Sequence, residues 1–557
     1  MENEVIAEQL SLLSKLMEIH GEDAFKSRSY ANAAFSIEKL PFQLKDTAEQ
    51  DIFKIRGIGD AIGKKILVMI HTGKLPQLEA IREKTPAGII DMLAIKGLGP
   101  KKIATIWKDL EVESLGELLY ACQENRLLLY KGFGSKSQEN IRQSLEFYFS
   151  SQGLFRYADA ESAAFELQTT IKGILDPYQV MLTGAIRRQE IIIDRIELLT
   201  DAPEDRIRNL GVEGLKLVNV AGEYLDFRFQ DKFNVRIFIV NPAKFAWKWF
   251  ETTGSAIFME EFLVHSRGRT MESAQTEQDI FSAAGLAVID PGMREGLGEI
   301  PLAASHKLPQ LISTSDIRGI IHCHSNWSDG LNSLEELAEA CLVNGFEYLV
   351  ISDHSKSAFY ANGLSPERVH AQHQLIDELN ARMAPFRIFK SIESDILNDG
   401  SLDYPKEILE TFDLVIASVH TNLKMSPEKT MARLLSAIEN PYTTILGHLT
   451  GRLLLSRPPY PVDHDRIIEA CVANGVVIEL NANPSRLDID WRHIPQVLKM
   501  GGLISINPDS HAVKGFGDIR YGVLAARKGG LTAANNLSSL HREQLGTYFL
   551  NRKKDRK

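Results

Sequence analysis

Apolar residues recur at every third or fourth position through the first 150 residues, as in AEQLSLLSKLMEI (7–19), which is the period of amphipathic helices. Between about 151 and 300 the pattern changes to short strand-like runs such as YLDFRFQ (224–230). After a linker rich in Pro, Ser and Gly (about 290–315), seven short apolar runs alternate with helical stretches. The pattern therefore predicts a helical region, an α+β region and a β/α region whose strands form a parallel sheet or barrel.

Three short phrases interrupt the helical region, and each places glycine, one other residue and glycine between an apolar lead-in and a helix. Paired glycines permit a tight turn with positive φ and leave the backbone bare enough for a phosphate to approach. The helix that follows offers unpaired N–H groups and a partial positive charge to an anion. One such phrase alone favours a structural turn, whereas three indicate contact with a nucleic-acid backbone. The residues predicted to bind DNA are Gly57, Gly59, Gly97, Gly99, Gly132, Gly134, Lys101 and Lys102.

Histidine and carboxylate side chains gather at the ends of the strands predicted after the linker. Of the 15 histidines, 11 lie from Asp316 onward. Six of the seven apolar runs end in His, Asp or Glu, and the remaining run carries Glu479 and Asn481. Because the carboxyl ends of parallel strands share one rim of a barrel, we expect these side chains to meet. The predicted metal ligands are His322, His324, Asp329, His354, Glu393, His420, His448, Asp509 and His511.

This donor set predicts the kind of metal and the reaction. Imidazole and carboxylate without thiolate suit Zn²⁺, Mn²⁺ or Fe²⁺, and the excess of histidine disfavours Mg²⁺ alone. Nine ligands exceed the needs of one ion, so we expect two to three divalent ions, Mn²⁺ or Zn²⁺, with Glu393 as a bridging carboxylate. Bridged ions about 3.5–4 Å apart activate water and bind both oxygens of an in-line phosphoryl displacement.

Composition and charge limit the number of domains, the mode of DNA binding and the compartment that we expect for this protein. A chain of 557 residues can hold about three to five domains. Its formal net charge of −10 repels nucleic acid, so DNA binding must rely on local features with positive potential, such as helix N-termini. Four cysteines without a C-x-x-C pair exclude a disulfide framework and a thiolate zinc site. No apolar run reaches the ~18 residues of a membrane span, and the first ten residues are not a signal peptide, so we expect a cytoplasmic protein with no membrane partner.

The first 150 residues resemble the DNA-binding half of the family X DNA polymerases. RSYANAAFSIEKLP (28–41) and GIGDAIGKKILVMIHTGKL (57–75) are similar to the small lyase domain of that family and its helix-hairpin-helix. The resemblance places the Schiff-base lysine of a possible lyase on Lys65 and the DNA-stacking tyrosine on Tyr30. An ordinary exposed helix lysine is the competing interpretation of Lys65.

The next region resembles the palm of the same family but departs from it where metal and nucleotide are bound. GAIRR (184–188) stands where the family has G-S-x-R-R, so Ala185 replaces the nucleotide-binding serine. For the paired metal-binding acids, one register keeps Asp194 and loses the second acid to Ile196, and the ungapped register places Arg195 and Glu197 there. Either way one carboxylate is lost, so we expect impaired Mg²⁺ and dNTP binding and an inactive palm. The residues of this degenerate polymerase site are Ala185, Arg187, Asp194 and Asp226.

Residues 316–557 resemble the polymerase-and-histidinol-phosphatase (PHP) domain, through motifs such as HCHSNWSDG (322–330) and NPDSHA (507–512). All nine ligand positions carry the residue types of that family, which implies a distorted (β/α)7 barrel with a trinuclear metal site. Ile320 departs from the family, which commonly has Asp before the H-x-H. The resemblance implies Glu393, His420 and Arg452 as catalytic residues, with Arg486 as a further phosphate contact.

Together the regions resemble a bacterial family X DNA polymerase fused to a C-terminal PHP domain. The implied fold is multidomain α and α/β, with N-terminal helix-hairpin-helix domains, an α+β nucleotidyltransferase-like palm and thumb, and the PHP barrel. The implied domains are 1–85 (lyase-like, with a helix-hairpin-helix), 86–150 (fingers-like, with a helix-hairpin-helix), 151–300 (palm and thumb) and 316–557 (PHP).

The leading hypothesis is a DNA repair protein that acts on gapped or 3′-end DNA as a metal-dependent 3′–5′ exonuclease, with the palm as a scaffold. In the family the PHP half has this activity, often with 3′-end cleaning or abasic-site activity. Three alternatives remain: an active gap-filling polymerase, a phosphomonoesterase of the histidinol-phosphatase type, and a binding scaffold that recruits repair partners.

Overall fold

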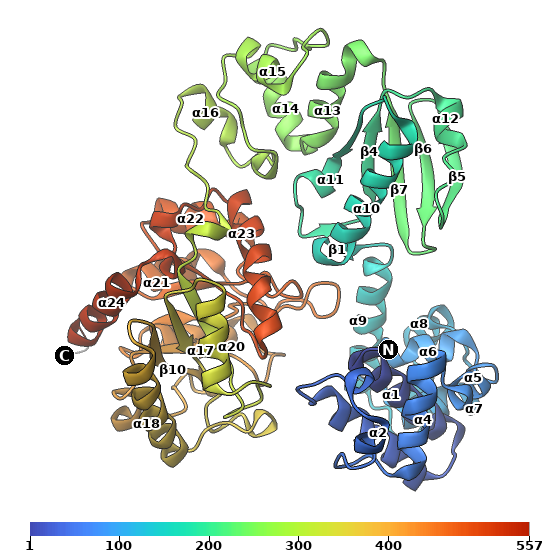
Figure 1. The fold of residues 1–557 in the computed structure, drawn as a ribbon, viewed down its shortest axis with the longest axis vertical. Helices are drawn as coiled ribbons and strands as arrows, with labels where there is room; N and C mark the ends of the chain where they lie inside the picture. The colour runs from blue at the N-terminus through green and yellow to red at the C-terminus, as the bar shows by residue number, and fades with distance from the viewer. Residues whose placement is uncertain (556–557) are drawn as a thin grey trace. The chain divides into compact units, whose positions relative to one another are not determined.

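The computed structural model describes residues 1–555, which divide into two compact units, Met1–Gln152 and the rest of the chain from Gly153 (Figure 1). Among the described residues, no helix is both long enough and apolar enough to cross a membrane.

The first unit is entirely helical. Helix α1 packs against α2, α5 and α7, and it buries Ile6, Leu10 and Leu13 in the common core. Asp23 begins α2 by accepting a hydrogen bond of 2.8 Å from the N–H of Phe25. The α-helices are α1 (Asn3–His20), α2 (Ala24–Glu38), α3 (Glu49–Ile52), α4 (Asp60–Thr72), α5 (Pro76–Arg82), α6 (Ala87–Asp91), α7 (Pro100–Lys108), α8 (Leu115–Gln123) and α9 (Ser135–Ser151).

The second unit begins with an α+β region built on a five-stranded sheet. The strand order is β2-β4-β7-β6-β5, and every neighbouring pair is antiparallel except β4 and β7. Strand β6 alternates buried and partly exposed residues, so Leu225, Phe227 and Phe229 face a core shared with helix α10 (Tyr157–Leu175). The strands are β2 (Val180–Thr183), β4 (Ile196–Thr200), β5 (Leu215–Ala221), β6 (Tyr224–Phe229) and β7 (Phe233–Ile239).

Four helices follow this sheet and enclose an aromatic cluster made of Phe250, Phe258, Phe262 and Phe281. These helices are α13 (Phe245–Thr253), α14 (Ala256–His265), α15 (Glu277–Ala283) and α16 (Glu299–Ala304).

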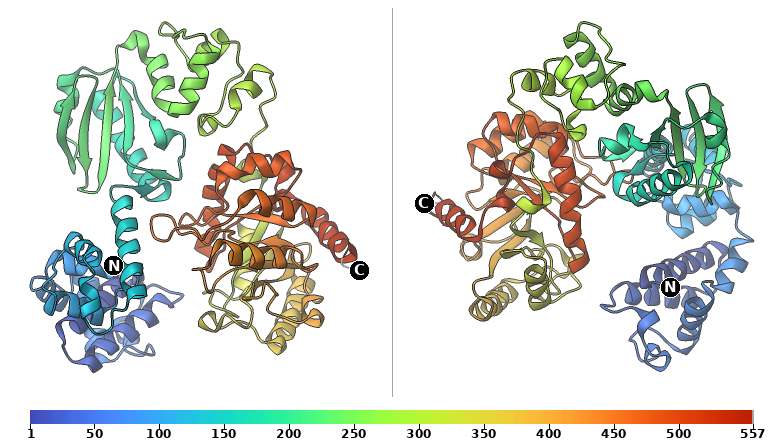
Figure 2. Two further views of the ribbon diagram at one scale, coloured as in Figure 1. Left: turned by 180° about the vertical axis from the view of Figure 1, so that it is seen from behind. Right: turned by 45° about the horizontal axis from the view of Figure 1, so that its top comes forward.

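The C-terminal part is a nearly closed barrel of seven parallel strands, as the resemblance implied. Strand order follows the sequence from β8 to β14, and a bridge between Cys323 and Ser510 joins the two ends. The strands are β8 (Gly319–Cys323), β9 (Tyr348–Ile351), β10 (Arg387–Asp395), β11 (Leu414–Ser418), β12 (Ile445–Leu446), β13 (Val477–Asn481) and β14 (Ile504–Asn507). The main helices of this part are α17 (Leu334–Val343), α18 (Pro366–Met383), α20 (Pro427–Ile438), α21 (His464–Ala473), α22 (Ile494–Lys499), α23 (Ile519–Lys528) and α24 (Arg542–Asp555) (Figure 2).

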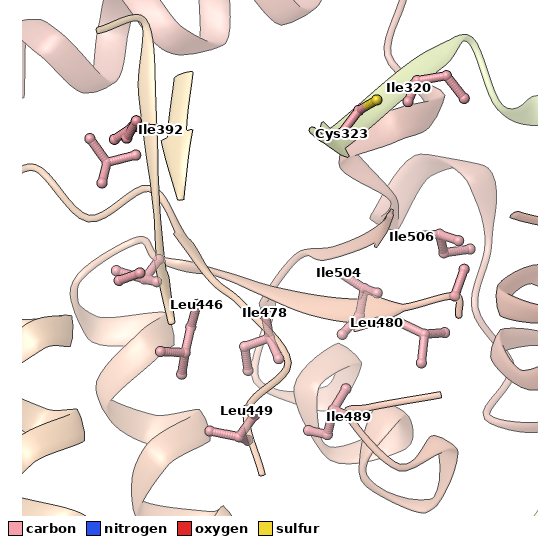
Figure 3. Packing of buried hydrophobic residues seen from close by; sticks show 14 of the residues in the cluster. Ile320, Cys323, Ile392, Leu446, Leu449, Ile478, Leu480, Ile489, Ile504 and Ile506 are labelled. Carbon is pink, nitrogen blue, oxygen red and sulfur yellow. The ribbon is translucent and has the colours of Figure 1, made fainter. Parts of the chain in front are cut away.

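The barrel strands are buried along almost their whole length. Ile392, Ile478 and Ile504 pack in one continuous apolar cluster with Ile320 (Figure 3). Because side chains on both faces of these strands are covered, the strands appear in the sequence as unbroken apolar runs instead of alternating ones. Ile320 is fully buried, so the position where the resembled family has Asp serves packing in this chain.

Candidate metal centre

The structure brings the nine predicted ligands together at the carboxyl ends of the barrel strands. This follows from the parallel arrangement, in which each strand delivers its last residues to the same rim. The donors are His322 and His324 from β8, Asp329 from the loop after it, His354 after β9, Glu393 on β10, His420 after β11, His448 after β12, and Asp509 and His511 after β14.

Glu393 lies at the centre of this cluster and is 1% exposed. Its Oε1 lies 2.9 Å from His448 Nε2 and 3.1 Å from His420 Nε2. Its Oε2 lies 3.0 Å from His354 Nδ1. The two oxygens of Glu393 therefore face different imidazoles, and Glu393 would hold a divalent ion together with these histidines.

Two further carboxylates extend the cluster on either side of His324 and His354. Asp509 Oδ1 lies 3.1 Å from His324 Nε2, and Asp329 Oδ1 lies 3.7 Å from His354 Nε2. Three groups of these residues each have donor atoms that lie within 4.8 Å of one another. The groups overlap, because His324 belongs to two of them and His354 also belongs to two. These donor sets suit divalent metal binding. Their members are His324, Asp329, His354 and His511; His322, His324 and Asp509; and His354, Glu393 and His420.

Buried atoms without hydrogen-bond partners show that these residues fit divalent metal binding. His322 Nε2, His354 Nδ1 and Glu393 Oε2 are buried, and none of them makes a hydrogen bond. The last two atoms are 3.0 Å apart, yet they are not aligned as donor and acceptor. Buried polar atoms are costly to leave unpaired, and a cation between these donors would satisfy them.

Two other carboxylates orient the histidines, and neither was among the predicted site residues. Glu479 accepts a hydrogen bond of 2.6 Å from His322 Nδ1, and Asp395 accepts one from His420 Nδ1. Each bond directs the opposite ring nitrogen toward Glu393. Carboxylate–histidine pairs of this kind fix the tautomer of a metal ligand. In the sequence Glu479 was visible only as the acid on the strand that does not end in a ligand.

The histidines and carboxylates of the cluster shift one another's pKa values in different directions. Burial opposes ionisation of Glu393, but the neighbouring His420 and His322 outweigh it and hold the pKa of Glu393 well below its usual range. Burial, together with His511 and His354, lowers the pKa of His324 to about 3. Burial opposes protonation of His420, but Glu393 and Asp395 outweigh it and raise the pKa of His420 to about 10. Because neutral imidazole is the form that binds a metal ion, metal binding at His420 would release a proton.

A pocket of about 320 Å³ opens onto the cluster and is lined by two arginines, Arg457 and Arg486. The expected phosphate contact Arg452 does not line it. Arg452 donates 2.6 Å to Asp490 and 2.9 Å to the carbonyl of Arg486, and it also binds the carbonyl of Leu487. These partners hold its guanidinium in the loop that carries Arg486, so the position of Arg452 does not fit direct catalysis.

The acids of the palm region are arranged unlike a metal site. Glu197, Arg236 and Asp226 are register neighbours on β4, β7 and β6, so an arginine separates the two carboxylates. Arg236 donates to both oxygens of Asp226, at 2.7 and 3.1 Å. Asp194 precedes the strand and pairs with Arg195 at 2.7 Å. Glu197, and not Asp194, shares the row of Asp226, which favours the ungapped register.

Arg187, aligned with a triphosphate-binding arginine, is already paired. It donates to both oxygens of Glu277, at 2.9 and 2.7 Å, and its guanidinium lies 3.4 Å from the centroid of the Trp249 ring. Arg294 also binds Glu277, at 2.6 Å. The two arginines outweigh the burial of Glu277 and lower its pKa to about 2. Beside this ion pair, Ala185 offers no hydroxyl to a nucleotide.

The three glycine phrases adopt one backbone geometry. Gly57, Gly97 and Gly132 have φ of 91°, 93° and 98°, a conformation that L side chains rarely adopt. The second glycines, Gly59, Gly99 and Gly134, are the N-caps of α4, α7 and α9, and no atom lies within 4 Å of where their side chains would start. Each phrase thus leaves a helix N-terminus uncovered within the first unit.

The lysines near these turns differ in their contacts. Lys101 is exposed, whereas Lys102 donates 3.2 Å to the carbonyl of Gly97 and 2.9 Å to Ser137. Lys65 Nζ lies 5.8 Å from the centroid of the Tyr30 ring. Tyr30 is buried, and its hydroxyl donates a hydrogen bond to Gln77 Oε1. In this position the Tyr30 ring faces the protein core.

Comparison with known proteins covers both the N-terminus and the whole chain. Residues 1–75 match the model of a helix-hairpin-helix domain. The DNA polymerase/3′-5′ exonuclease PolX of Bacillus subtilis (strain 168) is 32% identical over 563 aligned positions, which cover 97% of this chain and 98% of that protein.

The C-terminal region is also similar to proteins described as probable phosphatases. One from Caldanaerobacter subterraneus subsp. tengcongensis is 28% identical over 29% of this chain and 60% of that protein. One from Acetivibrio thermocellus is 30% identical over 27% of this chain and 58% of that protein.

Proposed function

The chain belongs to the PolX family of family X DNA polymerases, and we propose that it shortens DNA 3′ ends through the barrel while its palm no longer polymerises. Family membership and the helix-hairpin-helix imply DNA as a partner. The observation that carries the proposal is the contrast between the two sites. The barrel gathers eight candidate metal-binding side chains together with Glu393, whereas an arginine separates the palm acids.

The residues of the barrel have separate tasks in this proposal. Two or three divalent ions, Mn²⁺ or Zn²⁺, would supply activated water and neutralise charge on the phosphodiester. Glu393, Asp329, Asp509 and the six histidines would hold the ions, and Glu479 and Asp395 orient His322 and His420. Arg486 keeps its expected role as a phosphate contact and Arg457 takes the place of Arg452, because both Arg457 and Arg486 line the pocket.

The pairing of its basic residues supports an inactive palm. A nucleotidyl transferase needs carboxylates for two Mg²⁺ ions and a free cation for the triphosphate. Here Asp226 forms an ion pair with Arg236, and Arg187 forms an ion pair with Glu277. Among residues 1–555, groups of three or more His, Cys, Asp or Glu donors within 4.8 Å of one another occur only in the barrel.

The decisive experiment compares the wild type, His324→Ala and Asp226→Ala on one gapped DNA with a labelled 3′ end, in Mn²⁺, with and without dNTPs. We expect the wild type and Asp226→Ala to shorten the 3′ end, His324→Ala to fail, and no primer to grow. Growth that Asp226→Ala abolishes would show a working polymerase. Absence of shortening with any divalent metal would refute the nuclease.

The similarity to probable phosphatases favours one other function, hydrolysis of a phosphate monoester at the same site. Histidinol phosphate tests it directly. Fast hydrolysis of this compound, with no binding of gapped DNA, would show that the protein is a metabolite phosphatase and would refute the nuclease proposal.

A further inference from the structure

Two aromatic side chains stand exposed on a turn beside the metal centre. Phe359 and Tyr360 occupy the 3-10 turn η7 (Phe359–Ala361), and they are 88% and 68% exposed. Tyr360 lines the pocket together with Arg457 and Arg486, and its ring centroid lies 6.3 Å from that of His354. Adjacent exposed aromatic rings at the edge of a polar pocket are typical of a binding surface.

The turn is anchored on both sides, so the exposure of the two rings is built into the fold. The flanking Ala358 and Ala361 are 0% and 1% exposed. Ser355 and Leu364 form a β-bridge at the base of the turn, and Asn362 donates 3.2 Å to the carbonyl of Trp327. The small buried residues hold the backbone down and leave the rings between them on the outside.

We propose that Tyr360 is the stacking platform for the base of the 3′-terminal nucleotide, and that Phe359 extends it to the neighbouring base. The inference rests on the proposed function and names its substrate class, a DNA 3′ end whose last bases are unpaired. Aromatic rings stack on any base, which suits a nuclease without sequence preference. Tyr360 and the two arginines line one pocket, so the base and the phosphate of one nucleotide each find a partner there.

A substrate that lacks the terminal base provides the sharpest test. Two single-stranded oligonucleotides, identical except that one ends in a nucleotide without a base, are digested by the wild type, Tyr360→Ala, Tyr360→Phe and Phe359→Ala. On the normal end we expect Tyr360→Ala to raise KM about tenfold, with a smaller change in kcat, and Tyr360→Phe to retain the wild-type KM. On the end without a base, the wild type and Tyr360→Ala should have equal KM values, because no terminal base is present to stack on Tyr360.

Each other outcome has a fixed meaning. An equal loss for Tyr360→Ala on both ends, or a loss in Tyr360→Phe as large as in Tyr360→Ala, overturns the stacking role. An unchanged KM for Phe359→Ala removes Phe359 from the platform. Phe165→Ala, which removes a 49% exposed ring from α10, is the matched control. Failure of the wild type to shorten either oligonucleotide would instead refute the proposed nuclease.

Discussion

Individual side chains outside the ligand set determine how the metal centre is oriented. Glu479 is fully buried and accepts hydrogen bonds from His322 Nδ1, the N–H of His448 and Asn507 Nδ2, at 2.6, 2.7 and 2.8 Å. One carboxylate therefore fixes the approach of two ligands from different strands. In the α+β region, the partly buried Glu277 similarly binds both Arg187 and Arg294.

Replacement of Glu479 by Gln should weaken metal binding without removing a ligand. The amide keeps the size of the side chain but loses the charge that holds His322. We expect the affinity for Mn²⁺ to fall about 10- to 100-fold, measured by calorimetric titration of the metal-free protein. Glu469→Gln, at an exposed position of α21, is the control. Equal affinities of the two variants would exclude this role for Glu479.

The Glu277 ion pairs should make stability depend on pH in the acid range. The pKa of Glu277 in the folded protein, about 2, is lower than the ordinary value of 4.5. The stabilisation is therefore complete above about pH 5 and is lost as the pH falls toward 2. At pH 7, Glu277→Gln should lower the free energy of unfolding by about 3 kcal/mol, and denaturant titrations should show this difference shrinking below pH 4.5. A difference that stays constant down to pH 2.5 would contradict the ion-pair explanation.

At the scale of elements, helix N-termini and strand ends carry the groups that we propose for binding DNA and metal. The turns before α4, α7 and α9 repeat one conformation, in which the first glycine has positive φ and the second caps the helix. The barrel repeats another, in which a buried strand ends in a metal-binding side chain. In both, a regular element places polar groups with little freedom, because its own backbone is fixed by hydrogen bonds.

The second glycine of a turn allows DNA binding and stability to be separated. Gly99 has φ of −93° and no atom within 4 Å of where a side chain would start, so Gly99→Ala should fold with an unchanged Tm. The added methyl group would obstruct a phosphate at the N-terminus of α7, and we expect the Kd for gapped DNA to rise several-fold in a fluorescence anisotropy titration. Gly116→Ala, on α8 and equally open, is the control. An unchanged Kd for Gly99→Ala would exclude this turn from the DNA interface.

At the scale of the second unit, buried charges connect the α+β region to the barrel. Lys528 of α23 is 2% exposed and lies 2.5 Å from Glu295 and 3.2 Å from Glu190. Arg188 shares Glu295 at 2.9 Å. An arginine of the palm-like GAIRR motif thus joins the contact between the two regions.

Loss of the Lys528 charge should uncouple these two regions. Lys528→Met leaves Glu295 and Glu190 with fewer cations in a buried setting, a change that commonly costs about 3–5 kcal/mol. We expect the variant to have a lower Tm and to unfold over a broader range than the wild type in scanning calorimetry. Lys499→Met, at an exposed position, should behave like the wild type. A variant with wild-type Tm would show that the contact contributes nothing to coupling.

The sequence alone was sufficient to predict the features that depend on the local spacing of apolar residues and on the direction of the strands. Unbroken apolar runs ending in His, Asp or Glu indicate buried parallel strands, and the parallel arrangement brings the nine donors between His322 and His511 to one rim. The glycine pairs likewise predict their turns, since positive φ is a local requirement.

Pairing between distant side chains depends on tertiary packing and left no local signal. His322 meets Glu479 across 157 residues, and Arg187 meets Glu277 across 90. No motif distinguishes Arg457, which lines the pocket, from Arg452, which Asp490 holds away from it. The neighbours that the fold supplies decide whether an acid can act as a ligand, orients a histidine or is neutralised, because hydrogen bonds and contact ion pairs require their partners within about 3–4 Å.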